Sequence, residues 1–281
     1  MHTLTGREII LAAIVLLVLA AQPFLPHLAQ CQDYHHFSDT RVLWGVPNAL
    51  DTMSNIPFIL AGAAGMVLMW IGRLPAPTSA LGAMSLLTFA GLMATGIGSA
   101  WYHVQVPPND AGLAVDRYGM VIAFAGILGL AAADKVSERA GWCMGWLVLV
   151  AGPFAVWWWT QTGTIAPYAV LQFGGMALLV LILFWRTAPV SGTGATPGTP
   201  GTPAAAAAPG PASPASPSGQ RAGPNWGLLI GAYALAKVLE AADAQIWEIT
   251  LHTVSGHPLK HLAASCVALA VIVPLYRRKP V

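Results

Sequence analysis

Two histidines near the C-terminus have the spacing of a pair of metal ligands. His257 and His261, in the stretch "SGHPLKHLAAS", lie four residues apart at the head of a long apolar run. On a helix this spacing places both imidazoles on one face. Pro258 suits the first turn of a helix that Ser255 or Gly256 opens. The pair either binds a ligand or caps an ordinary membrane helix.

Polar residues of the same kind occur near the ends of two other apolar runs. "GIGSAWYHV" holds Ser99 and His103 four residues apart, and "AVDRYGM" holds Asp116. Three neutral imidazoles with an open fourth position form a catalytic zinc site. The sequence therefore predicts zinc ligands at His103, His257 and His261. We expect Asp116 to accept a proton from water and Ser99 to donate to the developing oxyanion.

Each of these residues also has an ordinary structural interpretation. A histidine at a helix end can lie at the membrane interface, and Ser99 can bond to the backbone. Asp116 can pair with Arg117 as a helix cap. The occurrence of HxxxH, SxxxH and an aspartate on one side of the membrane favours the metal site over three separate structural roles.

The helices that position these residues are long and apolar. The chain of 281 residues is 56% hydrophobic and 9% charged, with a mean hydropathy of +0.63, which is unlike a soluble domain. Runs long enough to cross about 30 Å of hydrocarbon occur at about 8–25, 52–72, 80–103, 114–133, 141–159, 165–185, 226–246 and 257–276. The sequence predicts an all-α, polytopic membrane protein with a seven-helix core and one N-terminal hydrophobic helix, not a β-barrel.

The distribution of basic residues predicts the orientation in the membrane. The net charge of +2 does not favour nucleic-acid binding. One side of the predicted topology holds Arg7, Arg73, Lys135, Arg139, Arg186, Arg221, Arg277, Arg278 and Lys279, whereas the loops of the other side hold Arg41. By the positive-inside rule, both termini are expected in the cytoplasm. We expect a bacterial inner membrane, with the candidate site toward the outer face.

The chain divides into four segments. Residues 1–30 are a hydrophobic segment that is either a membrane helix or a cleaved signal sequence. Residues 31–186 hold the outer loop and core helices one to five, and residues 225–281 hold core helices six and seven and a basic tail. Between them, 187–224 is a Pro/Ala/Gly/Ser tract predicted to be a disordered cytoplasmic loop. The three cysteines lack CxxC spacing and indicate neither a disulfide framework nor a thiolate metal site.

The outer loop 26–51 is rich in polar side chains. Asp33, Asp39, Asn48 and Asp51 offer the hard oxygen ligands that calcium takes, although Asx residues are also ordinary turn and cap residues. His35 and His36 have a simple alternative interpretation as solvated side chains. A calcium site in this loop is therefore a further expectation.

The run at 226–246 ends in the charged stretch "KVLEAADAQIWE". Lys237 and Glu240 lie three residues apart, as in an ion pair on a helix face. The alternative is that they and Asp243 support the metal site from outside its ligands.

Four short motifs resemble one known family. "DTMSNIPF", "GIGSAWYHV", "VDRYGM" and "GHPLKHL", in this order and separated by membrane helices, resemble the alkaline ceramidase family. They also resemble its wider superfamily of seven-helix membrane hydrolases, which includes the adiponectin-receptor type. The likeness covers about residues 33–276 apart from the low-complexity tract, with "HPLKH" where the family has His-x-x-Trp-His. We predict a bacterial-type member.

The resemblance implies a function and a set of ligands. In the family a zinc ion is held by one histidine at the end of the second core helix and two in the last, which match His103, His257 and His261. A serine and an aspartate complete that site and match Ser99 and Asp116. The implied activity is hydrolysis of the amide of an N-acyl lipid in the bilayer, without an inferable protein partner. The alternative from another class is a receptor or transporter whose polar layer binds a ligand without hydrolysis.

Overall fold

The computed structural model describes residues 3–105, 109–185 and 223–276, and these are mostly helical. No β-strand occurs in these ranges, which contain only two isolated bridges. The all-α prediction is therefore confirmed. The tract predicted to be disordered, 187–224, lies outside the described residues except for its last two.

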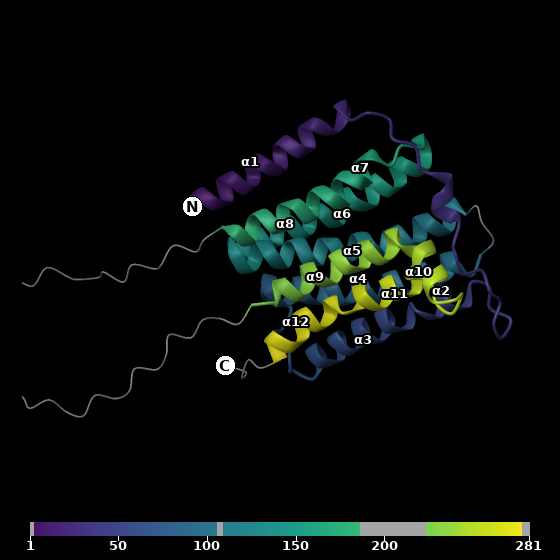
Figure 1. Cartoon of the computed structure of the whole chain (residues 1–281). Coiled ribbons are helices and arrows are strands. Elements are labelled where there is room, and N and C mark those ends of the chain that lie inside the picture. The colour runs from purple at the N-terminus through teal and green to yellow at the C-terminus, as the bar shows by residue number, and fades with distance from the viewer. Residues whose placement is uncertain (1–2, 106–108, 186–222, 277–281) are drawn as a thin grey trace, which may run out of the picture.

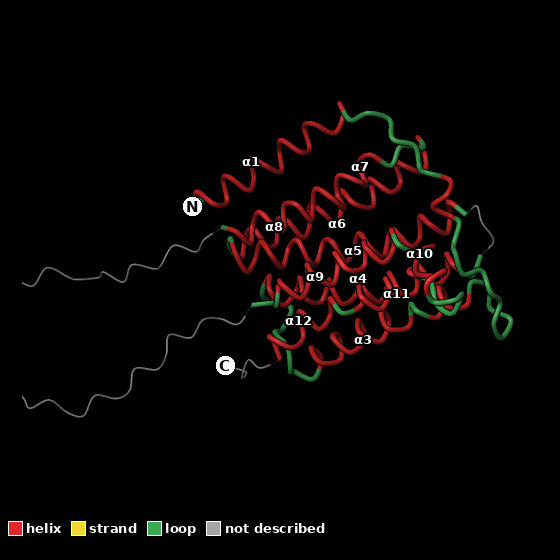
Figure 2. The backbone as a smooth tube through the Cα atoms, viewed as in Figure 1, coloured by secondary structure: helices red, strands yellow, loops and turns green. Residues whose placement is uncertain are grey.

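Long helices run alternately up and down in one bundle (Figure 1). Their order is α1 (Gly6–Ala21), α2 (Ala49–Met53), α3 (Ile56–Trp70), α4 (Ala80–His103), α5 (Asp110–Lys135), α6 (Glu138–Thr162), α7 (Ala166–Ala169), a π-helical turn (Val170–Gly174), α8 (Gly175–Phe184), α9 (Trp226–Ala241), α10 (Asp243–Ile249), α11 (Gly256–Ser265) and α12 (Val267–Tyr276). Two 3₁₀ turns, Gln22–Phe24 and Gln32–His35, lie in the connection after α1. The start of α1 and the end of α12 lie at the same end of the bundle (Figure 1). Figure 2 shows the long connection between α1 and α2 at the opposite end.

Seven helical stretches of the described residues are long and apolar enough to cross a membrane, so the chain is an integral, multi-pass membrane protein. They are Gly6–Phe24, Ala49–Trp70, Ala80–His103, Asp110–Lys135, Glu138–Thr162, Ala166–Phe184 and Gly256–Tyr276. The run predicted at 226–246 differs, because its helix is interrupted at Ala242. There α9 ends after 16 residues and the 7-residue α10 begins. This segment still traverses the bundle beside α11 (Figure 1).

Helix α5 is the centre of the bundle and α1 is at its edge. In the most apolar part of each helix, 72% of residues are buried in α5 and 11% in α1. Small residues allow α4 and α5 to approach backbone to backbone. A Cβ at Gly98 would lie 2.8 Å from the carbonyl oxygen of Val115, and one at Gly119 would lie 2.5 Å from the amide nitrogen of Thr95. This close contact brings the last turns of α4 against the first turns of α5.

Candidate metal centre

Three histidines from two distant parts of the chain meet inside the bundle. His103 is the last residue of α4, whereas His257 and His261 lie one turn apart on α11. Their exposed fractions are 1%, 8% and 5%, and one ring nitrogen of each lies within 4.8 Å of those of the other two. It is the one group of three or more His, Cys, Asp or Glu side chains in the described ranges that could hold a metal ion. The structure therefore brings the predicted ligand set together.

The spacing of the ring nitrogens fits a tetrahedral ion. Two nitrogens at about 2.0–2.1 Å from a tetrahedral zinc ion lie about 3.3 Å apart. The Nε2 atoms of His103 and His257 are 3.2 Å apart. Three buried imidazoles without a carboxylate among them also match the donor set that zinc accepts in catalytic sites. The residues present thus fit a divalent metal of this class.

A hydrogen-bond chain selects which nitrogen of His261 is available. Ser54, which follows α2, donates its hydroxyl hydrogen to the carbonyl oxygen of Asp51 at 3.0 Å. Its oxygen lies 2.8 Å from Nδ1 of His261. Since a hydroxyl has one hydrogen, the His261 Nδ1–H must be the donor in that contact. Nε2 then carries the free electron pair, as a metal ligand requires.

Backbone contacts fix the other two histidines. The amide of Asn48, which has a left-handed φ of 42°, donates to the carbonyl oxygen of His103 at 2.8 Å. The carboxylate of Asp243 accepts from the backbone N–H of His257 at 2.6 Å and from that of Ser38 at 3.1 Å. Asp243 therefore ties the start of α11, which carries two of the three histidines, to the outer loop, and its role toward a metal stays a prediction.

Aromatic packing covers the metal site from the outer loop. The ring of Phe37 lies edge-on at 4.6 Å from His103 and 5.0 Å from His257, measured between ring centroids. Phe58 of α3 lies 6.1 Å from His261. These rings limit the rotation of the imidazoles and keep water away from the side of the site that they cover.

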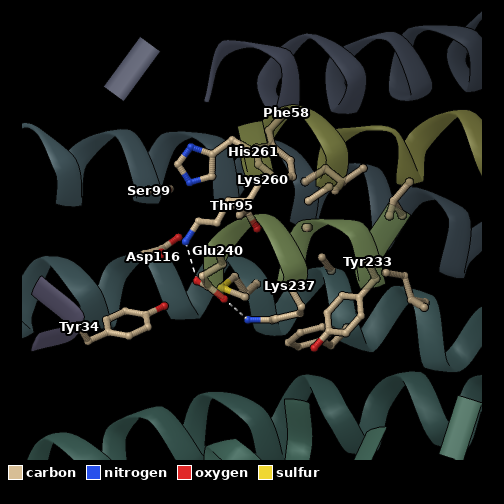
Figure 3. Close-up of a pocket in the computed structure, with 18 residues that line it drawn as sticks. Tyr34, Phe58, Thr95, Ser99, Asp116, Tyr233, Lys237, Glu240, Lys260 and His261 are labelled. Atoms are coloured by element: carbon tan, nitrogen blue, oxygen red, sulfur yellow. Dashed lines mark hydrogen bonds and ion pairs between the residues drawn. The ribbon is translucent and has the colours of Figure 1, made fainter. Parts of the chain in front are cut away.

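Ser99 and Asp116 line a cavity that begins at His261 (Figure 3). Ser85, Thr88 and Thr95 of the same helix each donate to the carbonyl oxygen four residues earlier. Ser99 has no such bond within the described ranges, so the alternative that it bonds to the backbone is wrong. Its hydroxyl is available to a molecule in the cavity.

Asp116 is not the helix cap that the structural alternative required. Helix α5 begins at Asp110, earlier than predicted, and Asn109 is its cap. Asp116 therefore lies in the second turn, 9% exposed. Arg117 instead bonds to Gln30 at 2.5 Å and packs against aromatic rings. No ion pair joins Asp116 to Arg117 in the part of the chain described, which leaves the carboxylate of Asp116 facing the cavity.

The predicted ion pair on α9 is part of a larger group. Lys237 Nζ lies 2.6 Å from Glu240 Oε2, and Lys260 Nζ lies 2.6 Å from Glu240 Oε1. All three side chains line the cavity that Ser99 and Asp116 also line. Sequence analysis did not predict the role of Lys260, although its position directly before His261 was a usable signal.

Two of the predicted calcium ligands in the outer loop bond to other residues of the protein. Asp39 is 1% exposed, and its two oxygens accept from the guanidinium of Arg41 at 2.8 and 2.7 Å. This pairing raises the pKa of Arg41. Asn48 bonds to the backbone of α4, and the side chain of Asp33 lies outside the described part of the structure. Among the described residues of this loop, no three His, Cys, Asp or Glu side chains converge as the three histidines do, and calcium stays a prediction.

His35 is buried, so the interpretation that this loop histidine is solvated is wrong. Its Nδ1 lies 2.9 Å from the hydroxyl of Tyr102, and its Nε2 lies 3.1 Å from the carboxylate of Asp110. These contacts join the outer loop to the end of α4 and the start of α5. His36, next to it, is exposed.

Several buried polar atoms near the histidines have no hydrogen-bond partner within the described ranges. They are both carboxylate oxygens of Asp51, the side-chain oxygens of Asn55 and Ser255, and Nδ1 of His103. Native proteins satisfy nearly all such atoms. The sequence pointed to Asp51 as a candidate calcium ligand and through the motif "DTMSN", whereas its unpartnered state is visible in the structure alone.

Comparison with models of protein families, with curated proteins and with solved structures finds no match. The bundle and the histidine cluster therefore define the class by themselves: an integral, multi-pass α-helical membrane protein with a candidate metal centre at one end of its bundle.

Proposed function

We propose that this protein is a zinc-dependent hydrolase that cleaves the amide bond of an N-acyl lipid within the membrane, releasing a fatty acid and an amine. One observation carries the proposal. His261 of the three-histidine cluster lines a cavity that Ser99 and Asp116 also line, and within the described ranges neither of these two side chains makes a hydrogen bond or ion pair with another residue. The resemblance of four motifs to the alkaline ceramidase superfamily supports the same function, and we propose membership of that superfamily.

The chemistry divides between the metal and the chain. A bound zinc ion supplies a Lewis acid that polarises an amide carbonyl and activates water. Asp116 accepts the proton of the attacking water and returns it to the amine that leaves. The hydroxyl of Ser99 donates a hydrogen bond to the oxygen on which negative charge develops. The three imidazoles stay neutral throughout, because neutral nitrogen is the form that holds the metal.

The remainder of the cavity suits an acyl chain. Its other walls are formed by Leu92 of α4, by Phe124 and Ile127 of α5, and by Val267 of α12. An amphipathic cavity with a polar end at the metal site matches an N-acyl lipid, which has its amide at the boundary between a polar head and an apolar chain.

The decisive experiment is an assay of fatty acid release. Purified protein is incubated with a panel of ceramides and other N-acyl lipids, and the released fatty acid is measured by mass spectrometry in wild type and in His257→Ala. We expect about one zinc ion per chain and product from the wild type alone. Equal product from both proteins would remove the proposed site. A zinc-loaded protein that binds lipids from the panel without cleaving any would favour a receptor.

We also propose that both termini are cytoplasmic, in a bacterial inner membrane, with the metal site toward the outer face. The start of α1 and the end of α12 lie at one end of the bundle (Figure 1). Arg73 follows α3, Lys135 ends α5 and Arg139 lies in the first turn of α6, all at that end, which supports this orientation. In a variant without native cysteines, His252→Cys should react with an impermeant thiol reagent in intact cells and Arg73→Cys should not. The reverse labelling would invert the topology.

A further inference from the structure

A partly buried group of three charged side chains lies beside the histidine cluster. We call Lys237, Glu240 and Lys260 the lysine–glutamate triad. Figure 3 shows Glu240 between the two lysines, with Lys260 on the side of His261 and Asp116. Each carboxylate oxygen of Glu240 is 2.6 Å from one ammonium group. The exposed fractions of the side chains are 33% for Lys237, 22% for Glu240 and 14% for Lys260.

The triad carries more positive than negative charge. Two ammonium groups and one carboxylate sum to +1, and Asp116 is the remaining charged group among the described residues that line the cavity. Ionised Asp116 would balance the triad. Transfer of a proton from water to Asp116 leaves the net charge of the cavity unchanged, but a divalent metal held by three neutral imidazoles would add two positive charges beside the triad. A cavity at membrane depth with uncompensated positive charge is unfavourable unless an anion enters it.

The lysines also have hydrogen-bond donors to spare. An ammonium group has three N–H donors, and each lysine has one hydrogen bond within the described ranges, which goes to Glu240. The two oxygens of Glu240 are both engaged. The triad therefore offers several donors to the cavity, whereas its acceptors are occupied within the triad.

We propose that the triad binds a carboxylate carried by a lipid. This proposal rests on the proposed function and narrows its substrate class. The carboxylate has two sources in that reaction: the head group of an N-acyl amino acid, or the fatty acid that hydrolysis releases. A neutral head group, such as that of a ceramide, would leave the spare donors of Lys260 and Lys237 without a charged acceptor.

The test is equilibrium binding of three probes to the full chain in nanodiscs: N-oleoylglycine, N-oleoylethanolamine and oleate. The two amides share the acyl chain and differ in the charge of the head group. We expect N-oleoylglycine to bind about 10- to 100-fold more tightly than N-oleoylethanolamine, the usual value of a charge-assisted contact. Tighter binding of N-oleoylglycine than of oleate assigns the triad to the head group, and the reverse order assigns it to the product.

Substitutions of the lysines and of the glutamate should change the affinity for anions in opposite directions. Lys260→Met should abolish the preference for the anionic probes, and Lys237→Met should reduce it. Glu240→Gln should strengthen anion binding, because the two ammonium groups then lack their internal carboxylate. A triad that is only structural predicts instead that all three changes weaken binding through loss of folding. Lys135→Met is the matched control, since this lysine pairs with Asp134 at the other end of the bundle.

The outcomes separate this proposal from the proposed function. Thermal unfolding of each variant identifies any that fails to fold, and Lys237→Met replaces Lys260→Met in that case. Absence of any preference for an anion in the wild type, or a preference that survives both lysine variants, overturns the triad site. Preferential binding without fatty acid release leaves the triad site standing and removes the hydrolase. Fatty acid release without any preference for the anionic probes would support the hydrolase and remove the triad site.

Discussion

The two ends of the bundle treat their buried polar groups differently. At the end that holds the start of α1 and the end of α12, Glu8 accepts from Arg139 at 2.8 Å and from Ser137 at 2.6 Å. Asp134 pairs there with Lys135 at 3.0 Å and accepts from the indole of Trp226 at 2.9 Å. At the opposite end lie the three histidines, Asp116 and Ser99, together with the unpartnered oxygens of Asp51, Asn55 and Ser255.

The difference distinguishes two kinds of polar group: those that hold the helices together and those that would bind a ligand. Polar groups that only hold helices together satisfy one another, because an unsatisfied buried group costs about 1–3 kcal/mol. Groups that serve a ligand keep their donors and acceptors available in its absence. We therefore expect substitutions at the histidine end to change metal content and turnover, and substitutions at the other end to change stability.

The largest effect is expected from His257→Ala. Loss of this imidazole leaves two ligands, so zinc content should fall toward zero and turnover should fall by at least about 10⁴-fold, because the Lewis acid is lost with its water. Metal analysis and lipid hydrolysis measure the two quantities on one preparation. His252→Ala, at an exposed histidine of the same end, is the control. Full zinc content in the His257 variant would contradict the ligand assignment.

Asp116→Asn should lower turnover while zinc remains. Asparagine keeps the shape of the side chain but cannot accept a proton at neutral pH, so the loss should be about 10²–10⁴-fold. Asp134→Asn is the matched control on the same helix, and it should keep normal turnover because its carboxylate serves an ion pair. Normal activity of a zinc-loaded Asp116→Asn protein would remove Asp116 as the base and leave the metal site intact.

Ser99→Ala should reduce turnover on the order of 10²-fold, the effect of losing one donor to the oxyanion. Zinc content should not change, since the hydroxyl is not a ligand. Ser85→Ala provides the control, because Ser85 lies on the same helix and its hydroxyl bonds to the carbonyl oxygen of Leu81. If the two variants have equal hydrolysis rates, Ser99 has no role in the reaction.

The meeting of the three histidines could be predicted from the sequence, whereas the residues that hold them in place could not. His103, His257 and His261 follow from two spacings of four residues and from a topology that places three helix ends on one side. The roles of Ser54 and Asp243 depend on how the outer loop folds over α11, which no local spacing encodes. The resemblance to the alkaline ceramidase family did not point to Lys260 either, because the motif His-x-x-Trp-His has tryptophan where "HPLKH" has this lysine.

Helix boundaries show why part of the fold was beyond prediction. Apolar composition predicted the spans, but α5 begins at Asp110 because Asn109 caps it, and this early start removes Asp116 from the cap. The break between α9 and α10 falls at Ala242, in a stretch without proline or glycine. There the tertiary contacts of Asp243 with Ser38 and His257 override a strong local preference for helix.

Ser54→Ala tests the support of the metal centre directly. The variant loses the acceptor that holds the Nδ1–H of His261, so zinc affinity should fall about 10- to 100-fold, the usual effect of such a partner. Competition with a zinc chelator measures the affinity. Thr52→Val, on the same short helix, removes a hydroxyl that bonds to the carbonyl oxygen of Pro47 and should leave zinc affinity unchanged. Equal affinities in the two variants would show that His261 needs no such partner.

The smallest effect on turnover is expected at the opposite end, from Glu8→Gln. Glu8 is 7% exposed and joins α1 to the start of α6 through Arg139 and Ser137, while its contact with Thr5 caps α1. Loss of its charge weakens these bonds without touching the cavity, so zinc content and turnover should stay at wild-type values. The midpoint of thermal unfolding should fall by about 2–4 °C.

The same contacts make α1 part of the folded bundle, which favours a retained membrane helix over a cleaved signal sequence. The mass of the protein purified from membranes should therefore include residues 1–30. Glu248→Gln, at a glutamate with a 74% exposed side chain, is the control and should not shift the midpoint. A mature chain that begins after residue 21 with an unchanged midpoint would show that α1 contributes nothing to the bundle. A large loss of turnover in Glu8→Gln would instead break the division between the two ends, because a structural ion pair would then govern the chemistry from the far side of the membrane.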